Sequence, residues 1–400
     1  MKILMLTPYL PYPPASGGQI RTLYLLKYLG KNHDITLVAL YKDNHEKSYA
    51  DYLKSYCKEI YLCKRATNPW QLQIILKAIF SALPFLIVRN FSQEAKTIIE
   101  KLLKEKHFDV IHAETFYIMP HIPKTNIPTL LVEQTVEYKV YQHFISTLPF
   151  YLRLPFSVDI LKLKMWETFY WQKADLVATV SDSDQHEIQK LTKNLKSVVI
   201  PNGAGDEMFV DRFPKLDKKN PKLLFVGNFF WLQNVEAAKY LINKILPRLL
   251  VSMPETRLII AGQNSTKKLG KQANSNVSII DLAPDDGETV KKLYQTSTIF
   301  IAPIFGPGGT RLKILASMAA GLPVISTKVG VEGLGVKDGV HVLIAHGPAE
   351  FVEKITDILD NEVQYKIIQK NAHALVKKHF SWKAIAQKLE NVYRGIGTQL

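Results

Sequence analysis

The chain has 400 residues, 47% of them hydrophobic, and a net charge of +15 at pH 7. This length exceeds one ordinary hydrophobic core, so we expect two domains. The excess of Lys and Arg is shared about evenly between the two halves of the chain. Such dispersed charge favours anionic substrates or an anionic membrane leaflet over a nucleic-acid-binding stripe. Because the sequence has no zinc-finger, basic-zipper or RNA-binding signature, we expect no nucleic-acid partner.

The two cysteines, Cys57 and Cys63, have neither the spacing nor the histidine partners of a metal site. We therefore expect reduced thiols, no bound metal and a cytoplasmic protein. Residues 1–10 form a short apolar run followed by Pro11, which predicts a first strand rather than a signal peptide. No uninterrupted run of about 18 apolar residues occurs, so we expect no transmembrane helix.

The start of the chain has the strand–loop–helix–strand order of a doubly wound domain. Strands are predicted over 2–7, 34–41 and 60–63, and a helix over 20–29. The loop between the first strand and the helix ends in Gly17 and Gly18. Ligands of such domains bind at the carboxyl ends of the strands, so both glycines are candidate ligand-binding residues. A plain turn into the helix is the alternative.

Two stretches of the first half are unusually apolar or aromatic. Residues 71–88 predict one helix, for which a membrane interface is a candidate location. Residues 138–173 combine Phe, Tyr and Trp with Lys and Arg. This second stretch is either the core and rim of a helical layer or a face that touches lipid, with its cations at headgroup level.

Four more strands are predicted in the first half, over 109–113, 128–132, 174–180 and 197–200. Glu114 follows the first of these strands and Glu133 the second. For Glu133 and the nearby Glu137, local capping or pairing is the simpler interpretation. The turn Pro201-Asn202-Gly203 and the polar, Lys-rich residues 206–220 then mark a linker.

The second half repeats the alternation of strands and helices. Strands are predicted over 223–226, 257–261 and 277–280, and helices over 235–250, 286–296 and 382–394. We therefore expect the fold class to be α/β, with a doubly wound parallel sheet in each half.

One strand–loop–helix unit in the second half has the features of an anion site. A buried strand over 299–304 is followed by Gly306-Pro307-Gly308-Gly309, and Thr310 stands where a helix N-cap is expected. Free backbone N–H groups and the positive end of the helix attract anions. Arg311 and Lys313 add two cations, and Arg suits a bidentate grip on phosphate. The alternative is a tight turn with two solvated cations.

Motifs along almost the whole chain resemble those of family 4 retaining glycosyltransferases, which have the two-domain B-type fold. The matching segments are MKILMLTPYLPYPPASGGQIR, DVIHAE, ADLVATVS, VIPNG, LLFVGNFFWLQNVEA, LIIAG and GGTRLKILASMAAGLPVISTKVGVEGL. Together these segments are far more specific than any one of them. The FSW that precedes the last predicted helix also fits this family.

The resemblance implies two Rossmann-like domains that face each other across a cleft. We expect an acceptor-binding domain over residues 1–203, a linker over 204–220 and a nucleotide-sugar-binding domain over 221–380. Residues 381–400 would form a helix that crosses back to the N-terminal domain.

The implied activity is the transfer of a hexose from a nucleotide-diphosphate sugar, with retention and without a metal or other cofactor. The acceptor would be a lipid-linked or polysaccharide precursor of the bacterial cell envelope. The enzyme would be cytoplasmic, with the anionic inner face of the cell membrane as a candidate peripheral location.

The resemblance also assigns roles to individual residues. Arg311 and Lys313, with the backbone of the glycine-rich loop, would stabilise the leaving diphosphate. Glu114 is a third catalytic candidate, because family members often have a histidine there that contacts the sugar or helps to deprotonate the acceptor. A structural carboxylate at the strand end is the alternative for Glu114. The donor-binding candidates are Gly17, Gly18, Asn202, Gly227, Asn228, Gly262, Gly308, Gly309 and Thr310.

The main departure from the family pattern is Ala316, where a glutamate usually accepts hydrogen bonds from the ribose hydroxyls. Alanine cannot do this, and Ser317 points about 100° away on a helix. Asn228 and Gln233 stand where the family usually has Arg and Lys. A second hypothesis is therefore a non-catalytic relative that binds nucleotide sugar or partners an active transferase. A nucleotide-sugar epimerase of the same fold is a third.

Overall fold

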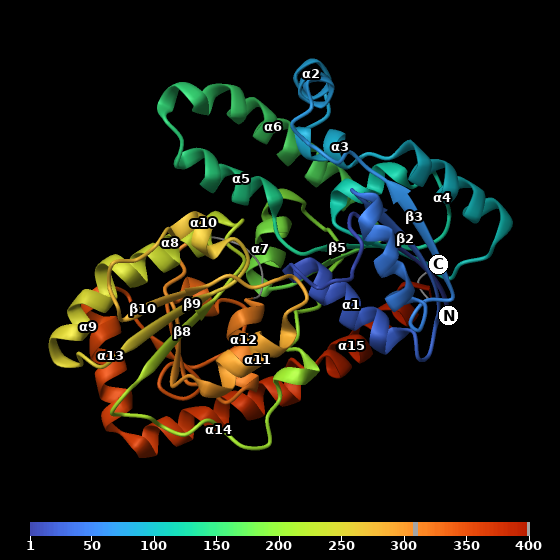
Figure 1. The fold of residues 1–400 in the computed structure, drawn as a ribbon. Helices are drawn as coiled ribbons and strands as arrows, with labels where there is room; N and C mark the ends of the chain where they lie inside the picture. Colours follow the sequence, from blue (N-terminus) through green and yellow to red (C-terminus); the bar gives the residue numbers. More distant parts are fainter. Residues whose placement is uncertain (307–310, 398–400) are drawn as a thin grey trace. The chain divides into compact units, whose positions relative to one another are not determined.

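The computed structural model describes residues 1–306 and 311–397, with the backbone alone at Leu152 (Figure 1). The chain divides into two compact units. The N-terminal unit comprises residues 1–201 and 385–397, and the C-terminal unit comprises residues 202–306 and 311–384. Each unit has its own hydrophobic core, as expected for a chain that is too long for one.

Within residues 1–201, seven strands form a parallel sheet in the order β3-β2-β1-β4-β5-β6-β7. The strands are β1 (Lys2–Thr7), β2 (Asp34–Tyr41), β3 (Glu59–Lys64), β4 (Val110–Glu114), β5 (Thr129–Glu133), β6 (Leu176–Thr179) and β7 (Ser197–Val199). In register, Met5 of β1 lies between Leu37 of β2 and His112 of β4. Every residue of β4 and β5 is buried, as in a sheet that is covered on both faces.

Three helices of the N-terminal unit begin at serine caps. The helices of this unit are α1 (Gly17–Leu29), α2 (Leu72–Phe80), α3 (Phe85–Asn90), α4 (Gln93–Glu105), α5 (Glu137–Ser146), α6 (Phe150–Lys173), α7 (Asp182–Leu191) and most of α15 (Trp382–Gly397), with 3-10 turns η1 (Asn44–Leu53) and η2 (Phe116–His121). The side chains of Ser16, Ser92 and Ser181 accept from backbone N–H groups at the starts of α1, α4 and α7.

Two predicted helices of this unit have different bounds in the structure. The first helix begins at Gly17 rather than at residue 20, because the Ser16 side chain caps it there. The single helix predicted over 71–88 is wrong: it divides into α2 and α3, with Pro84 in extended conformation at the N-cap of α3. Proline lacks the N–H that a continuing helix needs, so α2 ends before it.

Within the described part of the C-terminal unit, six strands form a parallel sheet in the order β10-β9-β8-β11-β12-β13. The strands are β8 (Lys222–Val226), β9 (Arg257–Ala261), β10 (Val277–Ile280), β11 (Ile299–Ala302), β12 (Val324–Ser326) and β13 (Leu343–Ile344). This unit and the N-terminal one confirm the predicted class, an α/β chain with two Rossmann-like sheets.

The helical elements of the C-terminal unit are η3 (Asp206–Met208), α8 (Leu232–Tyr240), the π-helical turn η4 (Leu241–Ile245), α9 (Leu246–Ser252), α10 (Ser265–Leu269), α11 (Gly287–Thr296), α12 (Leu312–Ala319), η5 (Val329–Val331), α13 (Pro348–Asp360) and α14 (Glu362–His379). The helix predicted over 235–250 therefore begins earlier, and a π turn interrupts it. The N-cap of α12 is Arg311, so its prediction at Thr310 is wrong by one residue. Thr310 itself lies outside the described residues.

Candidate functional site

Each sheet has one point at which the strand order reverses, and ligands of doubly wound domains bind there, at the carboxyl ends of the strands. In the N-terminal unit this point lies between β1 and β4, and Glu114 is the last residue of β4. In the C-terminal unit it lies between β8 and β11. Gly227 directly follows β8 and Gly306 lies just beyond β11. Of the predicted site residues, Glu114 and Gly227 therefore lie at the two switch points.

Two glycines keep the backbone bare at the ends of the paired strands β8 and β9. A Cβ on Gly262, whose φ is +149°, would lie 1.7 Å from the carbonyl oxygen of Gly227. A Cβ on Gly227 would lie 2.9 Å from Cγ of Asn234 and 3.0 Å from Nζ of Lys313. Neither position can hold a side chain without moving its neighbours. Gly227 and Gly262, both predicted as donor-binding residues, thus form the closely packed floor of this switch point.

The Lys313 side chain extends from α12 to this floor. Its ammonium contacts the side-chain oxygen of Asn234 and lies 4.7 Å from the ring centroid of Phe225. Burial, together with the charge of Arg311, lowers the pKa of Lys313 to about 7. Among the described residues no carboxylate forms an ion pair with Lys313. An ammonium that lacks a counter-charge at a switch point is suited to an anionic ligand.

Arg311 stands at the N-cap position of α12, two residues before Lys313. Its Nη2 donates to the carbonyl oxygen of Gly306 over 2.7 Å, and its side chain is half-buried. The structure thus places both predicted cations at the start of α12. The predicted backbone contacts of Gly308, Gly309 and Thr310 lie outside the described residues and stay predictions.

The loop after β8 is organised by amide side chains. The Oδ1 of Asn228 accepts from the N–H of Phe230 over 3.0 Å, and Asn234 Nδ2 donates to the carbonyl of Asn228 over 2.7 Å. Sequence reasoning singled out Asn228 but missed Asn234, a buried polar residue in the first turn of α8. The neighbouring Trp231 and Phe230 are exposed, as is Phe305 beyond β11, which makes them candidates for contact with a flat ring.

Ala316 and Ser317 follow Lys313 on α12. Ser317 is fully buried, and its hydroxyl donates to the carbonyl oxygen of Lys313 over 2.8 Å. This hydroxyl is used within the helix, so it does not take the place of the carboxylate that Ala316 lacks.

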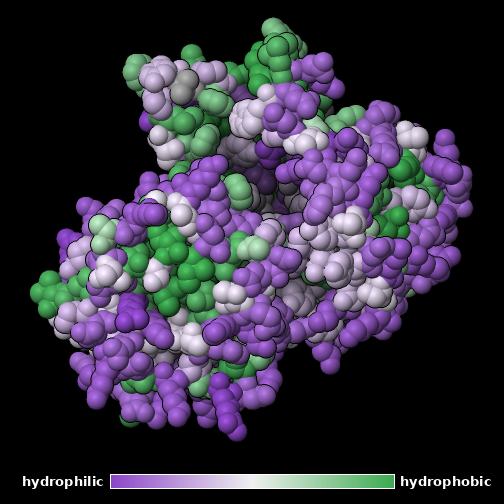
Figure 2. Space-filling view, in the orientation of Figure 1, coloured by the Kyte–Doolittle hydropathy of each residue, from purple (hydrophilic) through white to green (hydrophobic). Residues whose placement is uncertain are grey.

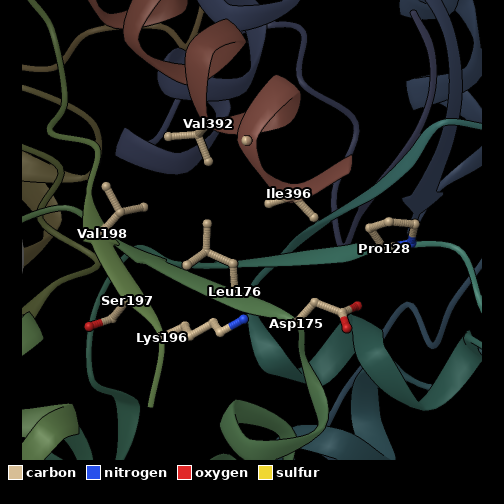
Figure 3. A pocket seen from close by; sticks show the side chains of 9 residues that line it. Pro128, Asp175, Leu176, Lys196, Ser197, Val198, Val392 and Ile396 are labelled. Atoms are coloured by element: carbon tan, nitrogen blue, oxygen red, sulfur yellow. The ribbon is translucent and has the colours of Figure 1, made fainter. Parts of the chain in front are cut away.

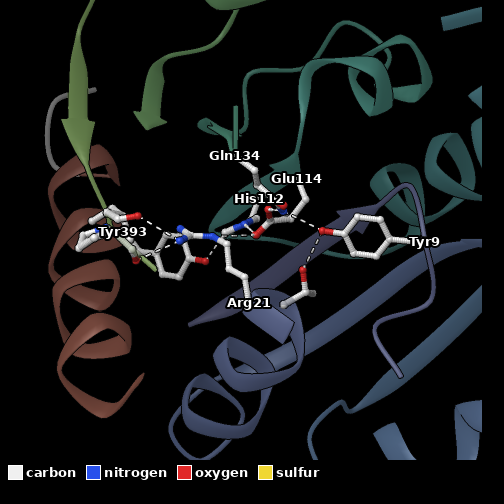
Figure 4. Close-up of polar contacts among 9 residues, drawn as sticks. Tyr9, Arg21, His112, Glu114, Gln134 and Tyr393 are labelled. Atoms are coloured by element: carbon white, nitrogen blue, oxygen red, sulfur yellow. Dashed lines mark hydrogen bonds and ion pairs between the residues drawn. The ribbon is translucent and has the colours of Figure 1, made fainter. Parts of the chain in front are cut away.

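The switch point of the N-terminal unit is filled by a buried polar network around Glu114 (Figure 4). His112 Nε2 lies 2.9 Å and Arg21 Nε 3.8 Å from Oε1 of Glu114, and Gln134 Nε2 donates to Oε2 over 2.6 Å. Burial acts to raise the pKa of Glu114, but His112, Arg21 and Gln134 outweigh it and lower the pKa. Glu114 is therefore an ionised carboxylate inside the core, with its hydrogen bonds satisfied.

The network extends to both ends of the N-terminal unit's chain. Arg21 Nη1 donates to the carbonyl oxygens of Ile200 and Pro201 over 3.0 and 3.1 Å, where the chain leaves this unit. Nδ1 of His112 contacts the hydroxyl of Tyr393 on α15, where the chain has returned. Arg21 and Tyr393 were missed by sequence reasoning, although an arginine within an otherwise apolar helix face was a usable signal.

Gly18 lies against the same network. A Cβ at this position would lie 2.5 Å from Oε1 of Gln134 and 2.6 Å from the hydroxyl of Tyr9. Gly17 and Gly18 form the first turn of α1, so their assignment to a loop is corrected. The close approach explains the glycine at position 18 within the unit itself. Asn202 is nearly buried at the start of the C-terminal unit, and its donor-binding role stays a prediction.

A second group of buried carboxylates follows β5. Oε1 of Glu133 accepts from Trp171 Nε1 over 2.9 Å. The carboxylate of Glu167, on α6, accepts from the backbone N–H groups of Glu137 and Tyr138 at 2.7 and 3.1 Å, and so caps α5. Burial, and then the charge of Glu167, raises the pKa of Glu133 well above the ordinary value. Burial, and then the charge of Glu137, does the same for the pKa of Glu167. The described residues contain no group of three or more His, Cys, Asp or Glu that could hold a metal ion.

A pocket of about 530 Å³ lies at the amino ends of two strands of the N-terminal sheet (Figure 3). It is lined by the amino ends of β6 and β7, with Asp175 and Lys196, and by Val392 and Ile396 of α15. Glu114 lies at the carboxyl ends of the strands, so this pocket is at the opposite end of the strands from Glu114.

Comparison with known proteins places this architecture in a family. The model described as "Glycosyltransferase Family 4" matches residues 15–207, and "Glycosyl transferases group 1" matches residues 220–361. An uncharacterised 44.6 kDa protein of the cps region of Klebsiella pneumoniae is 24% identical over 398 residues, which cover 96% of this chain and 97% of that protein. The phosphatidyl-myo-inositol mannosyltransferase of Mycobacterium leprae is 21% identical over 319 residues, covering 77% of this chain and 79% of that one.

Solved structures share the fold at lower identity. The structure of Anabaena HepE in complex with UDP-glucose has a TM-score of 0.67 and 15% identity, with 99% of this chain and 100% of that chain covered. One family model matches residues 15–207 and the other matches residues 220–361, so each of the two doubly wound sheets falls, apart from β1, within the range of one model. The chain belongs to the group 1 glycosyltransferases of the family 4 type, with the B-type fold.

Proposed function

We propose that the protein transfers a hexose from a nucleotide-diphosphate sugar to a glycan or glycolipid acceptor, with retention and without a metal. The observation that carries this proposal is the Lys313 ammonium, which lies at the β8–β11 switch point without a carboxylate partner among the described residues. The related fold of Anabaena HepE with UDP-glucose supports a nucleotide-sugar donor. Retention and metal independence rest on the family resemblance.

The proposed chemistry needs positive charge where the diphosphate leaves. As the glycosidic bond breaks, negative charge grows on the leaving phosphate oxygens, and Lys313 and Arg311 would stabilise it. Backbone N–H groups of residues 308–310 would add to this at the start of α12. Gly227 and Gly262 would let the donor approach the backbone closely.

The acceptor is assigned to the N-terminal unit. We propose an envelope glycan or lipid-linked acceptor at the inner face of the membrane, because one relative lies in a cps region and another is a phosphatidyl-myo-inositol mannosyltransferase. The buried network around Glu114 favours a positioning role for this residue over the direct deprotonation of an acceptor. The catalytic assignment of Glu114 is the alternative.

A non-catalytic relative that binds nucleotide sugar remains the second candidate. Ala316 supports it, since the carboxylate expected to hold the ribose is missing and Ser317 is engaged within α12. Calorimetry with UDP, GDP and ADP combined with transfer and donor-hydrolysis assays separates the two. Binding without turnover across a panel of nucleotide sugars would establish the second candidate.

Substitution of the cations tests the phosphate role. We expect Arg311→Ala and Lys313→Ala each to lower the rate of transfer or donor hydrolysis at least tenfold, about 1.4 kcal/mol in the barrier. Lys370→Ala, at an exposed position of α14, is the matched control and should leave the rate unchanged. Wild-type rates in the Arg311 and Lys313 variants would refute the proposal.

A further inference from the structure

Helix α6 is apolar on two opposite faces, although the protein covers only one of them. Ile160, Leu163 and Tyr170 are buried against the core of the N-terminal unit. The other face carries a stripe at helical spacing whose members are between 55% and 76% exposed: Leu154, Val158, Leu161 and Met165. An apolar stripe at helical spacing normally faces a core or another apolar environment, and this second stripe has none within the described residues of the N-terminal unit.

The neighbouring helix α2 also exposes large apolar side chains. Leu72, Ile79 and Phe80 are 69%, 61% and 83% exposed, and Trp70 just before the helix is also exposed. Figure 2 shows hydrophobic side chains gathered over α2, at the top of the view, and over the adjoining α5–α6 region. Isolated exposed apolar residues are ordinary, whereas a contiguous group marks an interaction site.

Hydrogen bonds join the two helices into one surface. Lys162 of α6 donates through Nζ to the carbonyl oxygens of Ala78 and Ser81 at the end of α2, at 2.9 and 2.7 Å. Trp166 Nε1 donates to the carbonyl of Ala82 over 2.8 Å. These contacts fix the end of α2 on α6 within the N-terminal unit. We name the exposed side chains the α2–α6 surface: Trp70, Leu72, Leu76, Ile79, Phe80, Phe150, Tyr151, Leu154, Val158, Leu161 and Met165.

The charges of the α2–α6 surface select its partner. Residues 70–80 contain no carboxylate, and 150–165 contain only Asp159, which is half-buried and accepts from the N–H of Phe85 over 2.9 Å. Lys77 and Arg153 are exposed cations within the two helices. A second copy of the chain would add like charges and no compensating carboxylate. Anionic lipid headgroups over an apolar interior match both features.

We propose that the α2–α6 surface docks the N-terminal unit on an anionic lipid bilayer, with its apolar side chains at the acyl boundary and Lys77 and Arg153 among the headgroups. None of the helices in the described ranges is long and apolar enough to cross a bilayer. Docking therefore takes place in the plane of the interface. This inference extends the proposed function by naming the surface that would bring the enzyme to a lipid-linked acceptor. Its test needs no catalysis, so the failure of either proposal can be told from failure of the other.

Flotation of the full chain with vesicles tests the proposal. We expect the protein to float with vesicles of phosphatidylcholine and phosphatidylglycerol at low salt, and much less with phosphatidylcholine alone or at high salt. The triple variant Leu154→Ser, Val158→Ser, Leu161→Ser should bind at least tenfold more weakly. Lys77→Glu should weaken binding at least fivefold. Val251→Ser with Val363→Ser, two exposed apolar positions of the C-terminal unit, is the matched control and should bind as the wild type does.

A spectroscopic readout locates the contact. Vesicles that carry brominated acyl chains should quench part of the tryptophan fluorescence of the wild type, and Trp70→Phe should remove that part. Circular dichroism confirms that each variant is folded, which is expected because the substituted side chains are exposed. Absence of wild-type binding to anionic vesicles at low salt would overturn the proposal, as would full binding of the triple variant. A concentration-dependent dimer that the triple variant loses would also overturn it and assign the surface to a second copy.

Discussion

Arg21 Nε lies 3.8 Å from Oε1 of Glu114, and both side chains are completely buried. Arg21 comes from α1 and Glu114 from the end of β4, so the pair spans the switch point of the N-terminal sheet. His112 and Gln134 supply the hydrogen bonds that a buried carboxylate requires. The pair therefore fixes the carboxyl edge of the sheet, where the acceptor is proposed to bind.

Removal of the carboxylate should destabilise the protein strongly. We expect Glu114→Ala to lower the free energy of unfolding by about 3–5 kcal/mol, because the Arg21 charge is left buried without its partner. Glu114→Gln keeps the shape and some hydrogen bonds, so its loss should be smaller. Urea denaturation of both variants gives the two values.

The glutamine variant also distinguishes the two roles of Glu114. As a positioning residue, Glu114→Gln should keep transfer activity within about tenfold of the wild type, with a loss that follows stability. A general base would instead lose about 100-fold or more in activity, well beyond what the loss of stability explains. The latter result would restore the catalytic assignment that the sequence suggested.

Diphosphate binding should take up a proton at Lys313. Burial lowers the pKa of this ammonium to about 7, and a bound diphosphate would raise it again. Between about pH 7.5 and 9.5 the free protein holds Lys313 mostly neutral, so the affinity for UDP should fall by up to tenfold for each pH unit. Calorimetry in two buffers with different ionisation enthalpies measures the proton uptake directly.

Lys313→Met is the control for this linkage. It should bind UDP more weakly, yet with little dependence on pH over the same range. Equal proton uptake by the wild type and Lys313→Met would place the titrating group elsewhere.

The glycine floor of the β8–β11 switch point should not tolerate a methyl group. In Gly262→Ala the new Cβ would overlap the carbonyl oxygen of Gly227 at 1.7 Å, so the backbone after β8 has to move. We expect a loss of stability well above about 1–2 kcal/mol, the ordinary penalty for alanine in a left-handed conformation, together with loss of UDP binding. Chemical denaturation and calorimetry measure the two effects.

Gly270→Ala isolates the conformational part of that effect. Gly270 has φ +70°, and nothing lies within 4 Å of its added Cβ. Its substitution should therefore cost about 1–2 kcal/mol and leave UDP binding intact. A similar loss at both positions would show that the contact with Gly227 is unimportant.

Local sequence patterns predicted the sheets but not the two buried networks. The run Leu258–Ala261 is apolar, and the strand Arg257–Ala261 matches the prediction residue for residue. One partner of Glu114, Arg21, is 93 residues away in the sequence, and Tyr393 is 281 residues from His112, which it contacts. A local sequence pattern does not predict such contacts, because only the folded sheet brings these residues together. In the same way, Pro84 was visible in the sequence, but the end of α2 also depends on Lys162 of α6.

The buried carboxyl of Glu133 should make stability fall with rising pH. Burial, and then the charge of Glu167, raises the pKa of Glu133 well above its usual value. The folded state then holds a proton that the unfolded chain releases above about pH 4.5, so folding takes up a proton and becomes less favourable as pH rises. Glu133→Gln removes this pH dependence, which amounts to up to about 1.4 kcal/mol of unfolding free energy per pH unit. Relative to the wild type, the variant should therefore gain stability between pH 6 and 8.5, as measured by urea denaturation. Glu353→Gln, at an exposed position of α13, should leave the pH profile unchanged, and an unaltered profile in Glu133→Gln would show that Glu133 is ionised in the folded protein.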